Sequence, residues 1–233
     1  MKFHAENHVI LLAAGRGERM GHSVPKQFCR VGGGRPLLYF SLETLLAHRL
    51  VASVCVVLPE KFIDFPLPEH GKLLPPVAGG GLRHISVLNG LRQLRCGAGA
   101  GVLIHDSARP FLPSSCIDAV CRSLGEADAV TPALPIDEAI LDRDSLMVVD
   151  RARYAIIQTP QAFRHSVLIE AFSSMEVLGF PGGRVPSCEY EMVRALVPSA
   201  SAKAVPGDSK NFKVTHPGDL ERATIFAKEM CSP

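Results

Sequence analysis

An apolar strand that runs straight into a glycine-rich turn constrains this sequence more than any other feature. Residues 9–12 are four large apolar side chains in a row, as expected for a strand buried on both faces of a parallel sheet. Residues 13–17 then read Ala-Ala-Gly-Arg-Gly. Such a turn lets backbone N–H groups approach anionic oxygens closely, and it is a common phosphate site at the carboxyl edge of a sheet. The stretch therefore predicts an α/β fold with an anion site beside its first strand.

Two familiar glycine motifs do not match this turn. A Walker-type loop needs four residues between its glycines, but five separate Gly15 from Gly21, and no Lys-Ser/Thr follows. A dinucleotide fingerprint would start at Gly15 and Gly17, but Met20 stands where its third small residue is required. The glycines alone are thus equally consistent with a structural turn.

Cations make the same stretch more specific. Arg16, Arg19 and Lys26 all lie within twelve residues of Gly15, and Glu18 is the one acidic residue near them. A solvated basic loop would account for the charges, whereas a polyanion site accounts for both the charges and the glycines. Backbone donors and cations together favour a phosphate-rich ligand.

The rest of the chain alternates between strand and helix patterns. Apolar runs predict strands, and apolar residues at helical spacing predict amphipathic helices. This alternation implies a parallel sheet with helices on both faces. The expected strands are 51–58, 101–106, 128–133 and 202–205; the expected helices are 36–48, a helix opened by the glycine run 79–81, one capped by Ser114 or Ser115, 167–178, 189–196 and 217–230.

Composition excludes several classes of protein. A chain of 233 residues fits one α/β domain or one domain with an arm. A net charge of +2 argues against nucleic acid as the main partner, and no apolar run reaches the roughly 20 residues of a membrane span. The seven cysteines are scattered, odd in number and without a Cys-x-x-Cys pair, which favours a reducing cytoplasm. A first strand starting by Val9 leaves no room for a signal peptide.

A carboxylate ends the apolar run 101–106. Asp106 would lie at the same sheet edge as the glycine-rich turn, where it could hold Mg²⁺ against phosphate oxygens. A turn-capping aspartate would look the same in the sequence. Further on, within residues 134–157, charges at 137, 138, 142, 143 and 144 come before the apolar run 146–149, which predicts an exposed hairpin outside the main sheet.

Together these stretches resemble the 2-C-methyl-D-erythritol 4-phosphate cytidylyltransferase family. The resemblance covers nearly the whole chain through five motifs in the family's order. The motifs are Ala13-Ala14-Gly15-x-Gly17-x-Arg19-Met20 with Pro25-Lys26-Gln27-Phe28, Gly81-x-Arg83-x-x-Ser86-Val87, His105-Asp106-x-Ala108-Arg109-Pro110, Asp150-Arg151 with Thr159-Pro160-Gln161, and Asn211-x-Lys213-Val214-Thr215-x-Pro217.

The resemblance implies one Rossmann-like domain over residues 1–233, with a mostly parallel twisted sheet, helices on both faces and a protruding β-arm at about 134–157 that joins a homodimer. It also implies CTP and a phosphorylated polyol as substrates, Mg²⁺ as the cofactor, and transfer of a cytidylyl group. The roles implied are catalysis by Arg19 and Lys26, nucleotide binding by Ala13, Ala14, Gly15, Gly17, Gly80, Gly81 and Ser86, metal binding by Asp106, and acceptor binding by Arg109, Arg151 and Lys213.

Two positions depart from the family pattern on the acceptor side. Ala139 stands where the family usually has threonine near the start of the arm, and Cys188 replaces a carboxylate before the late helix. Three other functions compete with the leading one. These are a ribitol 5-phosphate cytidylyltransferase, a nucleotide-binding protein without catalysis, and an NAD-dependent dehydrogenase, the last disfavoured by Met20. The choice of base does not follow from the residues, and CTP is implied by the resemblance alone.

Overall fold

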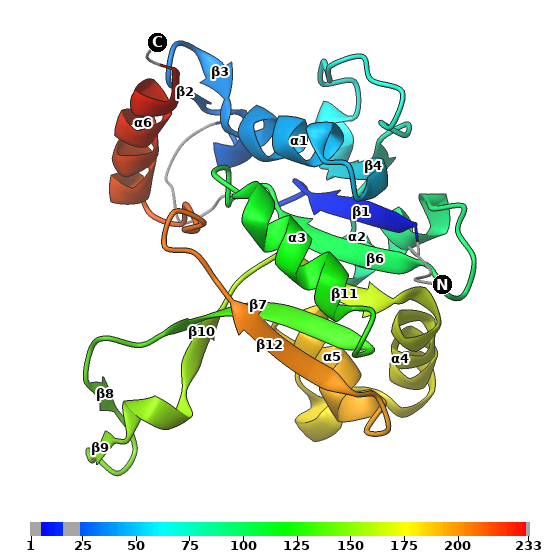
Figure 1. Cartoon of the computed structure of the whole chain (residues 1–233), viewed down its shortest axis with the longest axis vertical. Helices are drawn as coiled ribbons and strands as arrows, with labels where there is room; N and C mark the ends of the chain where they lie inside the picture. Colours follow the sequence, from blue (N-terminus) through cyan, green and yellow to red (C-terminus); the bar gives the residue numbers. More distant parts are fainter. Residues whose placement is uncertain (1–5, 16–23, 232–233) are drawn as a thin grey trace.

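Parallel strands form the centre of an eight-stranded sheet in the computed structural model, which describes residues 6–15 and 24–231 (Figure 1). The strand order is β10-β7-β11-β6-β1-β4-β5, and β12 pairs with β7 in parallel. Strand β1 pairs in parallel with both β4 and β6. The strands are β1 (Asn7–Leu12), β4 (Val51–Leu58), β5 (Val77–Ala78), β6 (Gly101–Asp106), β7 (Ala129–Pro135), β10 (Ala155–Ile157), β11 (Gln161–Arg164) and β12 (Ala202–Pro206).

Helices cover both faces of this sheet, as the alternating pattern predicts. Side chains of β1 point alternately to the two faces: Val9 and Leu11 pack with α1 and α3, and Ile10 packs with α2, α4 and α5. Side chains on both faces of the sheet are buried, which explains why the central strands are continuous apolar runs in the sequence. The helices are α1 (Leu37–Ala47), α2 (Arg83–Gln93), α3 (Ser114–Ser123), α4 (His165–Leu178), α5 (Glu189–Leu196) and α6 (Pro217–Cys231).

Two strands run against the others. Strand β11 inserts between β6 and β7 and is antiparallel to both, and β10 is antiparallel to β7. The sequence does not predict β11, because the four residues that follow the Thr159-Pro160 step carry too short an apolar pattern. The sheet is therefore mixed but mostly parallel, in agreement with the expected fold class.

The predicted hairpin extends from the sheet as an arm between β7 and β10 (Figure 1). Its tip is a two-stranded ladder of β8 (Ile140–Leu141) and β9 (Val148–Val149). A single 3₁₀ turn at Arg151–Arg153 leads back to β10. Apolar side chains on this arm are exposed to solvent, including Leu141, Leu146, Met147, Val148 and Ile156.

A third, smaller core lies beside α6. It joins α6 to the hairpin β2 (Arg30–Val31) and β3 (Arg35–Pro36) and to the start of α1. Phe111 is its centre, with Phe40, Phe212 and Phe226 around it. The remaining 3₁₀ turns are Lys26–Phe28, Glu60–Phe62 and Pro181–Gly183.

The cap of α3 differs from the sequence prediction, while the bounds of α1, α4 and α6 differ by one or two residues. Neither Ser114 nor Ser115 caps α3, because the helix already begins at Ser114 and its N-cap residue is Pro113, without a side-chain cap. Pro113 therefore occupies the N-cap position that was expected for one of the serines. No helix within residues 6–15 and 24–231 is long and apolar enough to cross a membrane.

Candidate active site

A cavity of about 590 Å³ opens at the carboxyl edge of the central strands. Parallel register brings Leu12 of β1 opposite both Asp106 of β6 and Val57 of β4, so these three strands end together. Ligands in open α/β sheets bind at this edge. The residues that line the cavity are Leu12, Ala14, Gly15, Lys26, Gln27, Gly80, Gly81, Leu82, Arg83, Ser86, Asp106, Ser107, Ala108, Lys213 and Thr215.

The first loop is fixed from behind by a buried glutamine. The Gln27 side-chain amide donates to the backbone oxygens of Ala13, at 2.5 Å, and Gly15, at 3.0 Å. Ala13 is itself buried and does not line the cavity, whereas Ala14 and Gly15 do. Gln27 thereby joins the end of β1 to the turn that carries Lys26.

The second glycine segment packs tightly against the first loop. A Cβ on Gly79 would come within 2.3 Å of the Ala14 Cβ, so only glycine permits this approach. Gly80 N donates to Ser86 Oγ at 3.0 Å, which ties the glycine run to the first turn of α2. The predicted nucleotide contacts Gly80, Gly81 and Ser86 thus share one wall of the cavity with Ala14.

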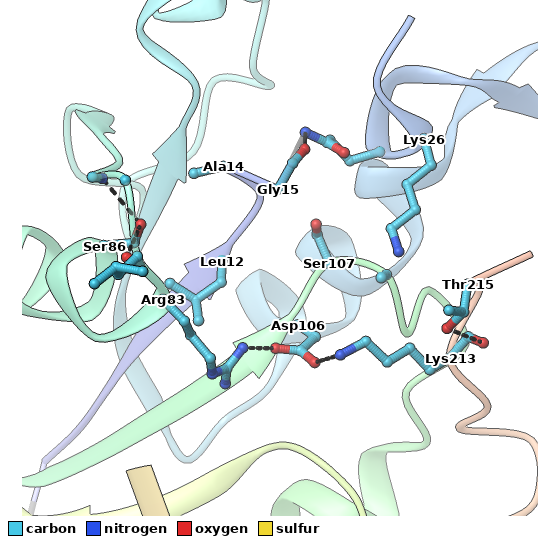
Figure 2. Close-up of a pocket in the computed structure, with 15 residues that line it drawn as sticks. Leu12, Ala14, Gly15, Lys26, Arg83, Ser86, Asp106, Ser107, Lys213 and Thr215 are labelled. Carbon is cyan, nitrogen blue, oxygen red and sulfur yellow. Dashed lines mark hydrogen bonds and ion pairs between the residues drawn. The ribbon is translucent and has the colours of Figure 1, made fainter. Parts of the chain in front are cut away.

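Asp106 lies between two cations on the cavity floor (Figure 2). Arg83 Nη1 donates to its Oδ1 at 2.5 Å, and Lys213 Nζ donates to its Oδ2 at 2.7 Å. Burial alone would raise the pKa of Asp106, but the charges and hydrogen bonds of these two cations outweigh burial and hold that pKa well below its usual range. Asp106 is therefore ionised at neutral pH.

A second buried carboxylate holds Arg83 from the other side. Glu189, the first residue of α5, accepts from Arg83 Nε at 3.2 Å and Nη2 at 3.0 Å, and its side chain is 2% exposed. Burial raises the pKa of Glu189, and the charge of Arg83 offsets only part of this effect. The chain Glu189–Arg83–Asp106–Lys213 joins α5, α2, β6 and the segment before α6.

Lys26 and Lys213 approach the cavity from one side (Figure 2). Lys26 Nζ donates to the backbone oxygen of Val214 at 2.7 Å, next to Lys213 in the chain. Lys26 and Lys213 are far apart in the sequence. The bond of Lys26 to the Val214 carbonyl and the bond of Lys213 to Asp106 bring both side chains to the same side of the cavity. This arrangement provides the concentrated positive charge that a polyphosphate requires.

A buried histidine supports the end of β6. Thr159 Oγ1 accepts from the Asp106 amide at 3.1 Å and lies 3.0 Å from His105 Nδ1, while His105 Nε2 lies 3.0 Å from the Arg109 carbonyl oxygen. Nε2 must carry a hydrogen, because the carbonyl can only accept, and in the neutral ring Nδ1 then accepts from the Thr159 hydroxyl. Burial lowers the pKa of His105 to about 4, consistent with this tautomer.

Several predicted site residues lie elsewhere or outside the described part of the chain. Arg19 and Gly17 belong to residues 16–23, which the structure does not describe. The Arg109 side chain is buried below the cavity, where its Nη1 donates to the Asn211 carbonyl at 2.8 Å. Arg151 lies on the arm and donates to the Asp137 carbonyl. The roles proposed for all four residues stay predictions.

The sequence analysis assigned no role to Arg83 or Glu189. Arg83 is part of a quoted motif, but an arginine at a helix start has many ordinary uses. Its partner is 106 residues away, so only the fold pairs them. The sequence does not predict roles for Gln27 and Ser107 for a similar reason, because their contacts are to backbone atoms at the end of β1 and in the loop after it: Ser107 N donates to the Leu12 oxygen at 3.0 Å.

Comparison with known proteins matches this arrangement to one family. The family model described as IspD, 2-C-methyl-D-erythritol 4-phosphate cytidylyltransferase, matches residues 7–229. The chain belongs to the IspD family. A relative of that name from Thermotoga neapolitana is 37% identical over 227 residues, covering 96% of this chain and 97% of the relative.

Other IspD relatives and solved structures agree. The bifunctional IspD/IspF enzyme of Maricaulis maris is 35% identical, and the match spans 92% of this chain but 55% of that enzyme. The crystal structure of the IspD enzyme from Thermus thermophilus superposes with a TM-score of 0.74 at 30% identity, covering 95% of this chain and 98% of that one. The Francisella tularensis structure, at 24% identity and a TM-score of 0.78, supports the fold. Membership of this family makes the chain a nucleotidyltransferase.

Proposed function

We propose that the chain transfers the cytidylyl group of CTP to 2-C-methyl-D-erythritol 4-phosphate, giving a CDP-alcohol and pyrophosphate for isoprenoid synthesis. The observation that carries this proposal is the convergence of Lys26, Asp106 and Lys213 on one cavity beside the loop Ala14–Gly15. The phosphate of the acceptor is already an anion near pH 7, so no general base is needed. The site's task is to bring two polyanions together and to stabilise charge at one phosphorus.

The reaction is a displacement at the α-phosphorus of CTP. An acceptor phosphate oxygen forms the new P–O bond, the bond from the α-phosphorus to the bridging oxygen breaks, and pyrophosphate leaves with that electron pair. Lys26 and Arg19 are the proposed donors to the triphosphate and to the five-coordinate phosphorus. Ala14, Gly15, Gly17, Gly80, Gly81 and Ser86 are proposed to hold the nucleotide. Ala13 is expected to do so too, but it is buried behind the cavity wall, where its backbone oxygen accepts from Gln27.

Mg²⁺ is the proposed cofactor, and Asp106 is its proposed ligand. Among the described residues, no group of three or more His, Cys, Asp or Glu side chains is arranged to hold a metal ion. One ionised carboxylate still fits Mg²⁺, which commonly takes one or two protein ligands and fills its shell with phosphate oxygens and water. When bound, the ion would neutralise charge on the phosphates. Lys213, whose side chain is 39% exposed, would then contact the acceptor phosphate.

We also propose that the arm, residues about 134–157, joins two copies of the chain in a homodimer. An isolated arm with exposed Leu146, Met147 and Val148 would be an aggregation hazard unless a surface covered it. In such a dimer Arg151 would reach an acceptor phosphate held by the other copy, and Arg109 would lie below it. The six cysteines whose side chains are described are free thiols, which supports a reducing compartment such as the cytoplasm.

The test is pyrophosphate release by the purified protein with CTP, Mg²⁺ and one acceptor at a time. Turnover with 2-C-methyl-D-erythritol 4-phosphate and none with ribitol 5-phosphate is expected. Turnover with ribitol 5-phosphate alone would replace the proposed acceptor; Ala139 and Cys188 both depart from the family pattern on the acceptor side. Tight CTP binding without pyrophosphate from either acceptor would favour a non-catalytic nucleotide-binding protein.

A further inference from the structure

Arg83 and Lys213 occupy the two oxygens of Asp106 in different ways. Arg83 is held by three hydrogen bonds, one to Asp106 and two to Glu189. Lys213 makes one bond to the same carboxylate, and its side chain is the more exposed of the two, at 39% against 26%. Figure 2 shows both cations in line with the carboxylate, one on each side.

This asymmetry decides which cation can leave. Releasing Arg83 would strand Glu189, a carboxylate 2% exposed, without its cationic partner, and an unpaired buried charge is strongly unfavourable. Releasing Lys213 leaves no buried charge without a partner, because Asp106 stays bonded to Arg83 and the flexible, solvent-accessible ammonium can move to a phosphate oxygen nearby. Oδ2 is therefore the oxygen that becomes available, and Oδ1 stays bonded to Arg83.

We propose that Glu189 is a positioning residue: it holds Arg83 on Oδ1 of Asp106, draws two of the guanidinium donors away from that carboxylate, and so leaves Oδ2 for the metal–nucleotide complex. Lys213 covers Oδ2 until phosphate draws the ammonium away. This inference rests on the proposed function, since it presumes that Asp106 meets a metal-bound triphosphate. It adds two residues, Arg83 and Glu189, to those that control the site.

Glu189 also limits how strongly Arg83 competes with the metal. A guanidinium shared between two carboxylates has its donors divided, with one facing Asp106 and two facing Glu189. Without the Glu189 charge, Arg83 would be free to pair fully with Asp106 and oppose a cation there. Substitutions at Glu189 and Arg83 should therefore change the metal dependence in opposite directions.

The experiment measures the metal-dependent gain in CTP affinity. The dissociation constant of CTP is determined by calorimetry in EDTA and again with Mn²⁺, without acceptor so that no turnover occurs, and the ratio is the gain. Glu189→Gln should lower the gain about fivefold, and Arg83→Gln should raise it by a similar factor, as order-of-magnitude expectations for one partly screened charge. Asp106→Asn should abolish it.

A double-mutant cycle tests whether Glu189 acts through Arg83. In the Arg83→Gln background, Glu189→Gln should change the gain less than about twofold. An equal effect in both backgrounds would overturn the proposal, because the two charges would then act independently. Where Arg83→Gln alone does not fold, the double variant, which carries no unpaired charge, is compared with Glu189→Gln. A gain that stays low in the double variant would also overturn it.

Matched controls lie on the same helices. Glu191→Gln alters the neighbouring surface carboxylate of α5, which pairs with Arg184, and Arg92→Gln alters an exposed arginine of α2. Neither should change the gain. If the wild-type protein itself shows no gain, the proposed metal role of Asp106 fails. If it shows a gain but the cycle is additive, only the positioning role of Glu189, acting through Arg83, fails.

Discussion

The cavity end of β6 and the tip of the arm are opposite kinds of surface. At the end of β6, charged groups are buried and nearly every one has a named partner, from Glu189 through Arg83 to Asp106. At the arm tip, apolar groups are exposed, with Leu146 and Val148 at 70% and 68%. Each region inverts the ordinary rule that charge faces water and apolar groups do not.

The buried charges at the end of β6 and the exposed apolar residues of the arm are stabilised in different ways. The buried carboxylates Asp106 and Glu189 find their cationic partners among the described residues of the same chain. The exposed apolar residues are not covered by any described part of the chain, so the arm needs something else to cover it. The difference teaches that the described part of the cavity is stabilised by pairing within the chain, while the arm leaves apolar side chains for the proposed dimer to cover.

Losing a cation from the cavity should have the largest effect. Lys26→Met removes a donor from the triphosphate site and should lower the turnover rate by about 10²- to 10³-fold, as for other lost donors to a transition-state oxygen. Lys61→Met, on the exposed turn Glu60–Phe62, is the matched control and should leave turnover unchanged. Turnover of Lys26→Met within tenfold of the wild type would contradict the proposed role.

Lowering the pH should reduce the free energy of unfolding through His105, which lies at the end of β6. The pKa of His105 is about 4 in the fold and 6.5 unperturbed, so between these values the unfolded chain binds the extra proton. The free energy of unfolding should therefore fall as pH drops from 6.5 to 4, by about 3 kcal/mol in total from this group.

The His105 contribution can be isolated by substitution. In His105→Gln that part of the pH dependence should vanish, as measured by urea unfolding at each pH. His70→Gln, which alters an exposed histidine, should keep the wild-type slope. An unchanged slope in His105→Gln would show that another group carries the pH dependence.

A charge on the arm should break association and leave the fold intact. Met147→Asp should weaken dimerisation by at least about tenfold in sedimentation measurements, because a carboxylate would be buried in the interface. Val177→Asp on α4 is the control, since Val177 is 81% exposed but lies off the arm. Equal loss of dimer in both variants would contradict an arm-centred interface.

The smallest effect should come from a surface ion pair. Glu191 pairs with Arg184 near the start of α5, where the arginine side chain is 59% exposed. Glu191→Gln should change the free energy of unfolding by no more than about 1 kcal/mol, because solvent screens such pairs. A substantially larger loss would mean that exposed charge matters here as much as the buried network does.

The central fold could be predicted because its signal is local. Strands 51–58 and 101–106 are continuous apolar runs that each end at a turn, and the structure has them at those residues. Helix 189–196 was predicted at its observed bounds from apolar spacing alone. Strand β11 was missed, because its assignment depends on its neighbours β6 and β7 rather than on its own four residues.

Site residues could be predicted where the residues of one motif are close together in the sequence. Gly80, Gly81 and Ser86 were named together and lie together on one wall, and Asp106 ends its strand as expected. The pairing of Arg83 with Glu189 could not be foreseen, since it requires the packing of α5 against the cavity floor. Arg109 shows the opposite case: its motif is intact, but its guanidinium bonds to the Asn211 carbonyl below the cavity.

The arm grows out of two strands that are already paired, with Leu134 of β7 opposite Ile156 of β10. Residues inserted or deleted in matched pairs between them would move the tip outward or inward, while the ladder at its root kept its alignment. Gln158 and Thr159, just beyond that root, would hold their bonds to Asn211. The length of the arm, and with it the reach toward the proposed second subunit, can therefore change without disturbing the residues beside the cavity.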